Sequence, residues 1–233
     1  DKGIAIMKNY AGTGDGGKID LGCIITVQTD FIPKLLNGYK AAAGGVAFNV
    51  REDTSIPLVK DLLSGCYDVV FCAKGNEDPD LAYVPVLTQK VVVAMSSDCP
   101  LVEKEFVTPT DLLEQHLITY VDTIPLGRAV RRMLDECGIK NVEYSYLDES
   151  ILAGFAANGV EAAVMLDTFL LRSVDDVVVR PFYPSALDRR SCHHRVYMAY
   201  STKNYHPYRV DPFIQHVIET KALKPDPNAC YID

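Results

Sequence analysis

Runs of positive charge are missing from this sequence of 233 residues. Lysine and arginine together number 23 against 31 acidic residues, which gives a formal net charge of −8 at neutral pH. The densest basic pair, Arg131–Arg132, lies in a segment whose pattern predicts an amphipathic helix. Because nucleic-acid binding needs a clustered basic surface, we do not expect this chain to bind DNA by itself.

Long apolar runs are missing as well. No apolar stretch approaches the roughly 20 residues that a transmembrane helix requires. The opening segment DKGIAIMKNY is too short and too polar to be the hydrophobic region of a secretory signal peptide. We therefore expect no membrane association and a cytoplasmic location.

Metal and redox motifs of cysteine are also absent. The seven cysteines are irregularly spaced, no CxxC occurs, and no Cys/His grouping has zinc spacing. Cys23, Cys66 and Cys72 lie within apolar segments. We expect reduced, partly buried thiols of a cytosolic protein, with a redox role for one pair as the alternative.

No catalytic motif stands out. There is no G-x-S-x-G segment, and the glycines between residues 12 and 17 precede the first expected strand, whereas a phosphate-binding loop follows one. His193 and His194 are neighbours on an expected strand, so their side chains should point to opposite faces. We predict a protein that is not an enzyme and holds no metal and no cofactor.

The first half of the chain alternates between strands and helices. Residues 1–17 indicate the flexible end of a linker. Apolar, β-branched segments predict strands at 18–27, 46–51 and 67–73, and helical spacing predicts helices at 31–39 and 56–63. Short links between such elements favour parallel strands with right-handed crossovers. These residues therefore predict one α/β lobe.

The second half repeats this pattern after a crossing. Residues 84–96 form an extended apolar run that is too long for one small sheet. Helices are predicted from Pro125 to Gly138, from Asp148 to Gly159 with the apolar residues Ile151, Leu152 and Phe155, and from Asp211. Strands are predicted at 116–121, 142–147, 160–166, 177–182 and 195–201. The predicted fold is α/β, with two Rossmann-like lobes joined by two crossover strands. Lobe I takes 18–88 and 203–224, lobe II takes 89–202, and 225–233 form a C-terminal tail.

Four segments, in this order, resemble the effector-binding domain of LysR-type transcription regulators. They are KIDLG with FIPKLL at 18–36, LVKDLLSGCYDVVFCA at 58–73, LTQKVVVAMSSDCPL at 87–101 and ESILAGFAANGVEAAVML at 149–166. The sequence departs from the family at Cys99, where many members carry histidine, and at Leu166–Asp167, where Leu–Pro is usual. The resemblance covers about residues 18–222.

The resemblance implies a ligand-sensing domain with the type 2 periplasmic-binding-protein-like fold. A small organic effector, with carboxylates as the favoured class, would bind between the lobes and control transcription by rearranging a homodimer or tetramer. DNA would be bound only through an N-terminal helix-turn-helix domain that this sequence does not contain. The alternative is the solute-binding protein of a transporter, although seven unpaired cysteines and the missing export signal argue against it. An enzyme on the same scaffold would need a placed general acid or base, and Asp30, Asp122, Asp148 and Asp167 are each explained as a cap or rim residue.

The predicted effector contacts lie at strand-to-helix turns, where helix N-termini favour anions. They are Thr26, Val27, Gln28 and Thr29, then Thr54 and Ser55, then Asp122, Thr123 and Arg128, and finally Leu166 and Asp167. Helix capping is the alternative role for the hydroxyl and acidic residues at these turns, and a solvent-facing position is the alternative for Arg128. The family's peroxide-sensing members use a cysteine near the turn at Thr123, but the next cysteine here is Cys137, so redox sensing is not expected.

Overall fold

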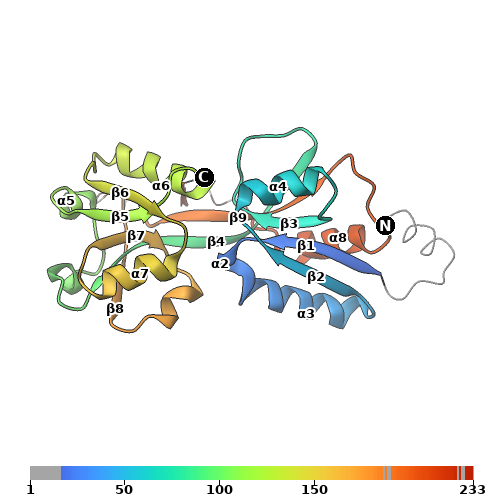
Figure 1. Ribbon diagram of the computed structural model, residues 1–233, viewed down its shortest axis with the longest axis horizontal. Helices are drawn as coiled ribbons and strands as arrows, with labels where there is room; N and C mark the ends of the chain where they lie inside the picture. The colour runs from blue at the N-terminus through green and yellow to red at the C-terminus, as the bar shows by residue number, and fades with distance from the viewer. Residues whose placement is uncertain (1–16, 186, 188–189, 225, 227–228, 233) are drawn as a thin grey trace. The chain divides into compact units, whose positions relative to one another are not determined.

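The computed structural model describes residues 17–185, 187, 190–224, 226 and 229–232. The chain forms two compact units: unit 1 comprises the described residues of Asp1–Leu87 and Val196–Lys224, and unit 2 those of Thr88–Arg195 and Pro225–Asp233. The chain changes unit inside two strands, β4 (Leu81–Ser96) and β9 (Cys192–Ser201) (Figure 1). The predicted linker lies, apart from Gly17, outside the described residues.

Unit 1 is built on a mostly parallel sheet. Its strands run in the order β2 (Ala47–Glu52), β1 (Lys18–Cys23), β3 (Val69–Cys72) and β9. The first three are parallel to one another, and β9 is antiparallel to β3. Because the links from β1 to β2 and from β2 to β3 pass through helices, this order is the one that strand–helix–strand units produce.

Helices cover both faces of this sheet. The alternating side chains of β3 divide between two apolar clusters. Val69 and Phe71 pack with α3 (Phe31–Ala43) and α8 (Val210–Lys221), whereas Val70 and Cys72 pack with α4 (Ser55–Leu63). The predicted helices of this unit are therefore present, and they bury the sheet on both sides as a parallel sheet requires.

One element of unit 1 differs from the sequence prediction. The strand predicted at 18–27 ends at Cys23, and α2 (Ile25–Gln28) follows it. The amide of Ile24 donates to the carbonyl of Phe71 at 3.0 Å, and the chain then turns, with the Val27 amide donating to the Ile24 carbonyl at 3.3 Å. The β-branched residues of this segment favour a strand locally, and the tertiary turn at the sheet edge overrides that preference.

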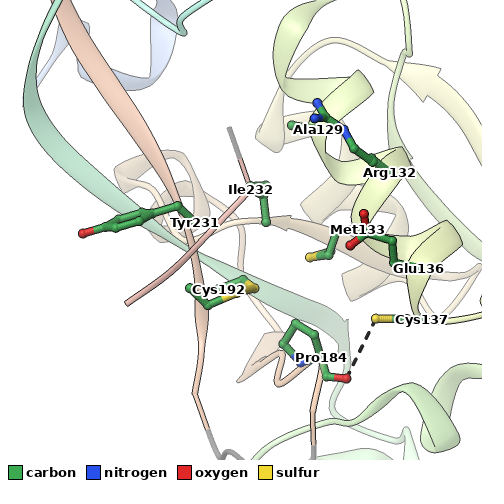
Figure 2. A pocket seen from close by; sticks show the side chains of 10 residues that line it. Ala129, Arg132, Met133, Glu136, Cys137, Pro184, Cys192, Tyr231 and Ile232 are labelled. Carbon is green, nitrogen blue, oxygen red and sulfur yellow. Dashed lines mark hydrogen bonds between the residues drawn. A yellow bond between two sulfur atoms is a disulfide. The ribbon is translucent and has the colours of Figure 1, made fainter. Parts of the chain in front are cut away.

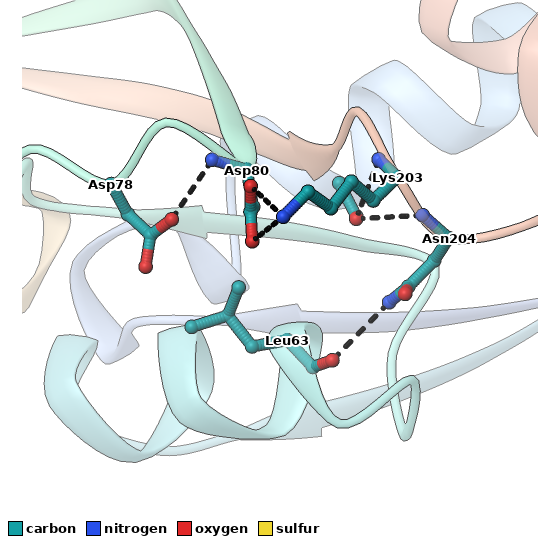
Figure 3. A network of polar contacts seen from close by, with 6 residues as sticks. Leu63, Asp78, Asp80, Lys203 and Asn204 are labelled. Carbon is teal, nitrogen blue, oxygen red and sulfur yellow. Dashed lines mark hydrogen bonds and ion pairs between the residues drawn. The ribbon is translucent and has the colours of Figure 1, made fainter.

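A polar network in unit 1 joins the residues after β9 to the end of α4 and to the loop before β4 (Figure 3). The ammonium group of Lys203 lies 2.6 Å from a carboxylate oxygen of Asp80, and the Asp80 carbonyl accepts the Thr202 amide at 2.8 Å. The side-chain amide of Asn204 donates to the carbonyl of Leu63, at the end of α4, at 3.3 Å. These bonds fix the exit of β9 against α4 and the loop before β4.

Unit 2 contains a mixed sheet. Its strands run in the order β4, β7 (Ala162–Leu166), β5 (Leu117–Tyr120) and β6 (Val142–Tyr146), and β8 (Val177–Pro181) also pairs with β4. Strand β5 is parallel to both β6 and β7, and β7 and β8 are antiparallel to β4. The helices are α5 (Pro109–Leu112), α6 (Pro125–Glu136) and α7 (Glu149–Ala157), with short 3-10 turns at Pro100–Glu103 and Phe169–Ser173.

The buried face of α7 does not carry all of its large apolar residues. Asp148 caps this helix as expected, accepting the amides of Ser150 at 2.9 Å and Ile151 at 3.1 Å. Ile151 and Phe155 are exposed, however, and Leu152 packs inward with small residues and Glu149 instead. The helix is apolar around much of its surface, so periodicity alone could not identify the buried side.

The predicted tail also takes part in the fold. Strand β10 (Cys230–Tyr231) pairs in parallel with the start of β9, and Cys192 forms a disulfide with Cys230. The expectation of seven reduced thiols is therefore wrong for this pair, which is separated by 38 residues in the sequence. None of the helices in the described ranges combines the length and apolar character that a membrane crossing requires.

Candidate functional site

The turn after β1 holds the first group of predicted contacts. Thr26 and Val27 are buried on α2, and Val27 belongs to the apolar core of unit 1. Gln28 is half-buried and Thr29 is exposed. Asp30 occupies the position before α3, but its carboxylate pairs with Lys34 and makes no capping hydrogen bond. Asp30 therefore does not cap α3 through its side chain.

The turn after β2 lies beside the first. The amide of Asp53 donates to the carbonyl of Cys23 at 3.3 Å, so the ends of β1 and β2 adjoin. Thr54 is exposed and precedes α4 without capping it through its side chain. Ser55 is buried, and its hydroxyl accepts the Ala73 amide at 3.1 Å. Ser55 thus ties α4 to the end of β3, and Thr54 is the more accessible hydroxyl.

In unit 2, the turn after β5 carries a compact set of charges. The carboxylate of Asp122 pairs with the guanidinium of Arg131, one turn further along α6 than Arg128. The guanidinium of Arg128 donates to the carbonyl of Thr123 at 2.8 Å and remains exposed. Arginine has five N–H donors, so this bond leaves most of them available to an anion.

Close backbone packing fixes this turn. A Cβ atom on Gly127 would lie 2.0 Å from the carbonyl oxygen of Val121, so only glycine lets the first turn of α6 approach the end of β5 this closely. Pro125 at the first helical position adds a fixed φ. Asp122 and Thr123 therefore lie between the end of β5 and the start of α6. These two elements pack closely at Gly127, so moving them apart would lose that packing.

The end of β7 lies next to the same turn. Leu166 is buried, and its amide donates to the hydroxyl of Tyr120, the last residue of β5, at 2.8 Å. Asp167 is exposed, and its amide donates to the carbonyl of Lys90 at 2.8 Å. The structure thus brings the two predicted groups of unit 2 together, with Leu166 as a core residue and Asp167 at the surface.

A buried Tyr–Glu pair underlies this edge of unit 2. The Tyr120 hydroxyl donates to Oε1 of Glu149 at 2.7 Å, and both side chains are almost fully buried. Burial raises the pKa of the Glu149 carboxyl to about 7, although the bond from Tyr120 opposes this shift. The pKa of Tyr120 lies well above its ordinary value, through burial first and the charge of Glu149 second. Its phenol therefore stays protonated.

Sequence reasoning missed both residues of this pair. Glu149 directly follows the helix cap Asp148, where an acidic residue is ordinary and solvent-exposed. Tyr120 ends an apolar strand, where an aromatic residue is also ordinary. Only the meeting of β5, β7 and α7 in space distinguishes them, and no local signal reports it.

One group among the described residues could hold a metal ion. His116, Glu143 and Glu161 offer ligand atoms that all lie within 4.8 Å of one another. They stand at the starts of β5, β6 and β7, the opposite strand ends from the predicted contacts. His116 Nδ1 already lies 2.6 Å from a carboxylate oxygen of Glu161. The direct contact between His116 and Glu161 accounts for the closeness of these two residues without a metal.

Comparison with known proteins identifies relatives of the whole fold. A family model described as the LysR substrate binding domain matches residues 12–222. An uncharacterized HTH-type transcriptional regulator of Bacillus subtilis, YybE, is 21% identical over 154 residues, which are 66% of this chain and 53% of that protein. The HTH-type transcriptional regulator TtuA of Agrobacterium vitis is 30% identical over 99 residues, or 42% of this chain and 33% of that protein. The chain thus spans about half the length of the first relative, and less of the second.

Solved structures agree with this family. The effector binding domain of QuiR in complex with shikimate has a TM-score of 0.79 at 19% identity, covering 88% of this chain and 97% of that one. The LysR family regulator HinK from Pseudomonas aeruginosa has a TM-score of 0.74 at 19% identity, covering 94% of this chain and 75% of that one. At these identities the likeness shows the fold, and it confirms the predicted fold class.

Proposed function

Because this chain belongs to the LysR substrate binding domain family, we propose that it is the effector-sensing part of a transcription regulator. The observation that carries this proposal is the family match over residues 12–222. The names of the two sequence relatives, both HTH-type transcriptional regulators, point in the same direction. The sensing role is a binding role, and we propose no catalytic step for this chain.

We further propose that DNA is contacted by a part of the protein outside this sequence. The chain spans about half of the regulator YybE, and its formal charge of −8 is unfavourable for binding a polyanion. A structure of the regulator CbnR with its target DNA covers 93% of this chain and only 74% of that protein, so the relative has further residues. We propose that the protein containing this acidic chain binds DNA through residues outside this sequence.

We propose that a small organic effector, with a carboxylate as the favoured class, contacts the strand-to-helix turns of each unit. In unit 1 the polar candidates are Thr26, Gln28, Thr29 and Thr54. In unit 2 they are Thr123, Arg128 and Asp167, with Asp122 held by its ion pair to Arg131. Val27, Ser55 and Leu166 are the other predicted contacts, and like Thr26 they are buried. The guanidinium of Arg128 and the helix starts supply the positive potential that an anion needs.

The effector would act by shifting a conformational equilibrium. A ligand changes the population of two arrangements only through its different affinity for them. We propose that those arrangements differ in how subunits of a homodimer or tetramer pack, and that this coupling reaches the DNA-binding part.

The test is a thermal-shift screen of the purified chain with small carboxylates, aromatic acids and amino acids. A ligand that binds only the folded state raises the melting temperature, because it stabilises that state. The free energy of unfolding rises by about 2.7 kcal/mol when the ligand concentration is 100-fold above Kd. We expect at least one acid to give a saturable shift, and we expect Thr26→Val and Arg128→Gln to weaken it. Thr220→Val, an exposed threonine on α8, is the matched control and should leave the shift unchanged.

Two results would contradict parts of this proposal. A saturable shift that survives both Thr26→Val and Arg128→Gln would show that the predicted turns are not the binding site. A strictly monomeric chain at all concentrations in analytical ultracentrifugation would contradict the role of oligomer rearrangement and favour a transporter's solute-binding protein instead.

A further inference from the structure

The disulfide between Cys192 and Cys230 fastens β10 to the start of β9. Cys230 stands opposite Cys192 in the parallel register, and Tyr231 stands opposite His193. The amide of Ile232 donates to the carbonyl of His193 at 3.1 Å, and the guanidinium of Arg195 lies 4.2 Å from the ring centre of Tyr231. Two residues of pairing are weak by themselves, so the covalent bond is the strongest attachment of this segment.

The fastened segment forms one wall of a cavity in unit 2. The cavity has a volume of about 200 Å³ and is open to solvent. Cys230, Tyr231 and Ile232 line it from one side, and Met133 and Cys137 line it from α6 and its end. Figure 2 shows Ile232 and Cys192 on one side of the opening and Met133 and Cys137 on the other. Without residues 230–232 this cavity would lose that wall.

We propose that this cavity is a thiol–disulfide exchange site, at which a low-molecular-weight thiol reversibly opens the Cys192–Cys230 bond. Oxidation fastens residues 230–232 and builds the cavity, and reduction releases them. The proposal does not depend on the effector site, and it places redox chemistry at a different position from the turn at Thr123.

The exposure of the two sulfur-bearing residues sets the direction of attack. Both residues line the cavity, but Cys192 is only 1% exposed, whereas Cys230 is partly exposed. A small thiolate therefore attacks Sγ of Cys230, the Cys192–Cys230 bond breaks, and Cys192 leaves as a thiolate that takes up a proton. A second small thiolate attacks the small-molecule sulfur of the mixed disulfide and releases Cys230. Two small thiols are oxidised to their disulfide as the protein disulfide gains two electrons and two protons, and oxidation reverses these steps.

Cys137 lies in the same cavity but is a poor competitor in this exchange. Burial, with a smaller effect from Glu136, raises the pKa of the Cys137 thiol, and only the thiolate is an effective nucleophile. Its sulfur also lies 3.9 Å from the Pro184 carbonyl, which favours the protonated thiol. Cys137 is therefore a matched control that shares the surroundings of the pair without sharing its bond.

The free thiol of Cys66 is chemically suited to a reducing environment. Cys66 is exposed and unbridged, and proteins of oxidising compartments seldom keep such a thiol. In surroundings that leave Cys66 reduced, small thiols are abundant and a reachable disulfide exchanges with them.

The test equilibrates the purified chain in buffers with graded ratios of reduced to oxidised glutathione, followed by acid quenching, alkylation and mass spectrometry. We expect Cys192 and Cys230 to change together in one two-electron step within these ratios, in the wild type and in Cys137→Ser. Hydrogen exchange of residues 230–232 should accelerate on the order of tenfold after reduction. In Cys192→Ser, glutathione should form a mixed disulfide with Cys230.

Three outcomes would overturn the proposal. A pair that stays oxidised at every glutathione ratio would be a purely structural disulfide, and a pair that stays reduced at every ratio would show that the bond does not form. An exchange rate of residues 230–232 that does not change on reduction would show that the bond does not hold the cavity wall. The wild-type measurements decide these points even if Cys192→Ser fails to fold.

Discussion

The hydroxyl of Tyr120 donates a hydrogen bond to Oε1 of Glu149 at 2.7 Å while it accepts the amide of Leu166 at 2.8 Å. One buried oxygen thereby joins the end of β5, the start of α7 and the end of β7. The predicted contacts of unit 2 follow β5 and β7, so the geometry of that edge depends on a buried residue that is not itself one of the predicted contacts.

Replacing Tyr120 with phenylalanine should destabilise unit 2. The change removes no apolar surface but leaves the Leu166 amide and a Glu149 oxygen buried without their partner. Each such group costs about 1–3 kcal/mol, so we expect the free energy of unfolding, measured by urea titration, to fall by roughly 2–6 kcal/mol. Tyr205→Phe, at an exposed tyrosine, should change it by less than about 0.5 kcal/mol. Equal effects of the two variants would contradict the structural role of the Tyr120 hydroxyl.

Glu149 should make the protein less stable as the pH rises. Its folded pKa of about 7 lies above the ordinary value of 4.5, so between these pH values the folded state binds more protons than the unfolded state. The neutral carboxyl contributes fully to the free energy of unfolding below about pH 4.5, and this contribution is lost as the pH rises through 7. The difference between the folded and unfolded pKa values corresponds to about 3 kcal/mol of that free energy.

Glu149→Gln should remove this dependence, because glutamine stays neutral at every pH. Between pH 5 and pH 8 we expect the free energy of unfolding of the wild type to fall relative to that of Glu149→Gln. Glu103→Gln, at an exposed carboxyl, is the control and should keep the wild-type profile. A Glu149→Gln profile parallel to the wild type in denaturant titrations would show that the carboxyl is not strongly desolvated.

Local chemistry predicted much of the fold. The start of α6 at Pro125, its end before Gly138 with a positive φ, and the capping of α7 by Asp148 all follow from residues adjacent in the sequence. Strand–helix alternation likewise predicted the parallel strands of unit 1. These features depend on backbone preferences and short-range hydrogen bonds, which a sequence displays directly.

Features that depend on distant contacts were not predictable. Ile151 and Phe155 are larger and more apolar than the alanines that α7 buries, so the size and apolarity of its residues do not identify the buried side of this helix. Cys192 and Cys230 meet only because β10 returns to the start of β9. The candidate effector contacts themselves remain predictions. Thr26, Val27, Ser55 and Leu166 are buried and the others are half-buried or exposed, and these exposures identify no ligand.

Gly127→Ala should disturb the turn after β5. The new Cβ would overlap the carbonyl of Val121, which is backbone and cannot rotate away. We expect a loss of about 1–3 kcal/mol, typical of overpacking, together with weaker effector binding through Thr123 and Arg128. Gly154→Ala provides the control, because a Cβ at this helical glycine meets nothing within 4 Å and should stabilise α7 by about 0.5–1 kcal/mol. Equal stability of the two variants in urea titrations would mean that the close approach at Gly127 is not required.

Removing the Cys192–Cys230 bond should lower stability only under non-reducing conditions. The bond closes a loop across 38 residues, and the chain-entropy relation assigns such a loop about 4 kcal/mol at 25 °C. We therefore expect the double variant Cys192→Ser/Cys230→Ser to unfold at lower urea than the oxidised wild type, and to match the wild type in excess reductant. Cys66→Ser, at an exposed free thiol, should follow the wild type in both conditions. A different result would contradict this prediction: reductant leaves the urea transition of the wild type unchanged while the double variant stays destabilised. The packing of the two sulfurs, and not the covalent bond, would then stabilise the fold.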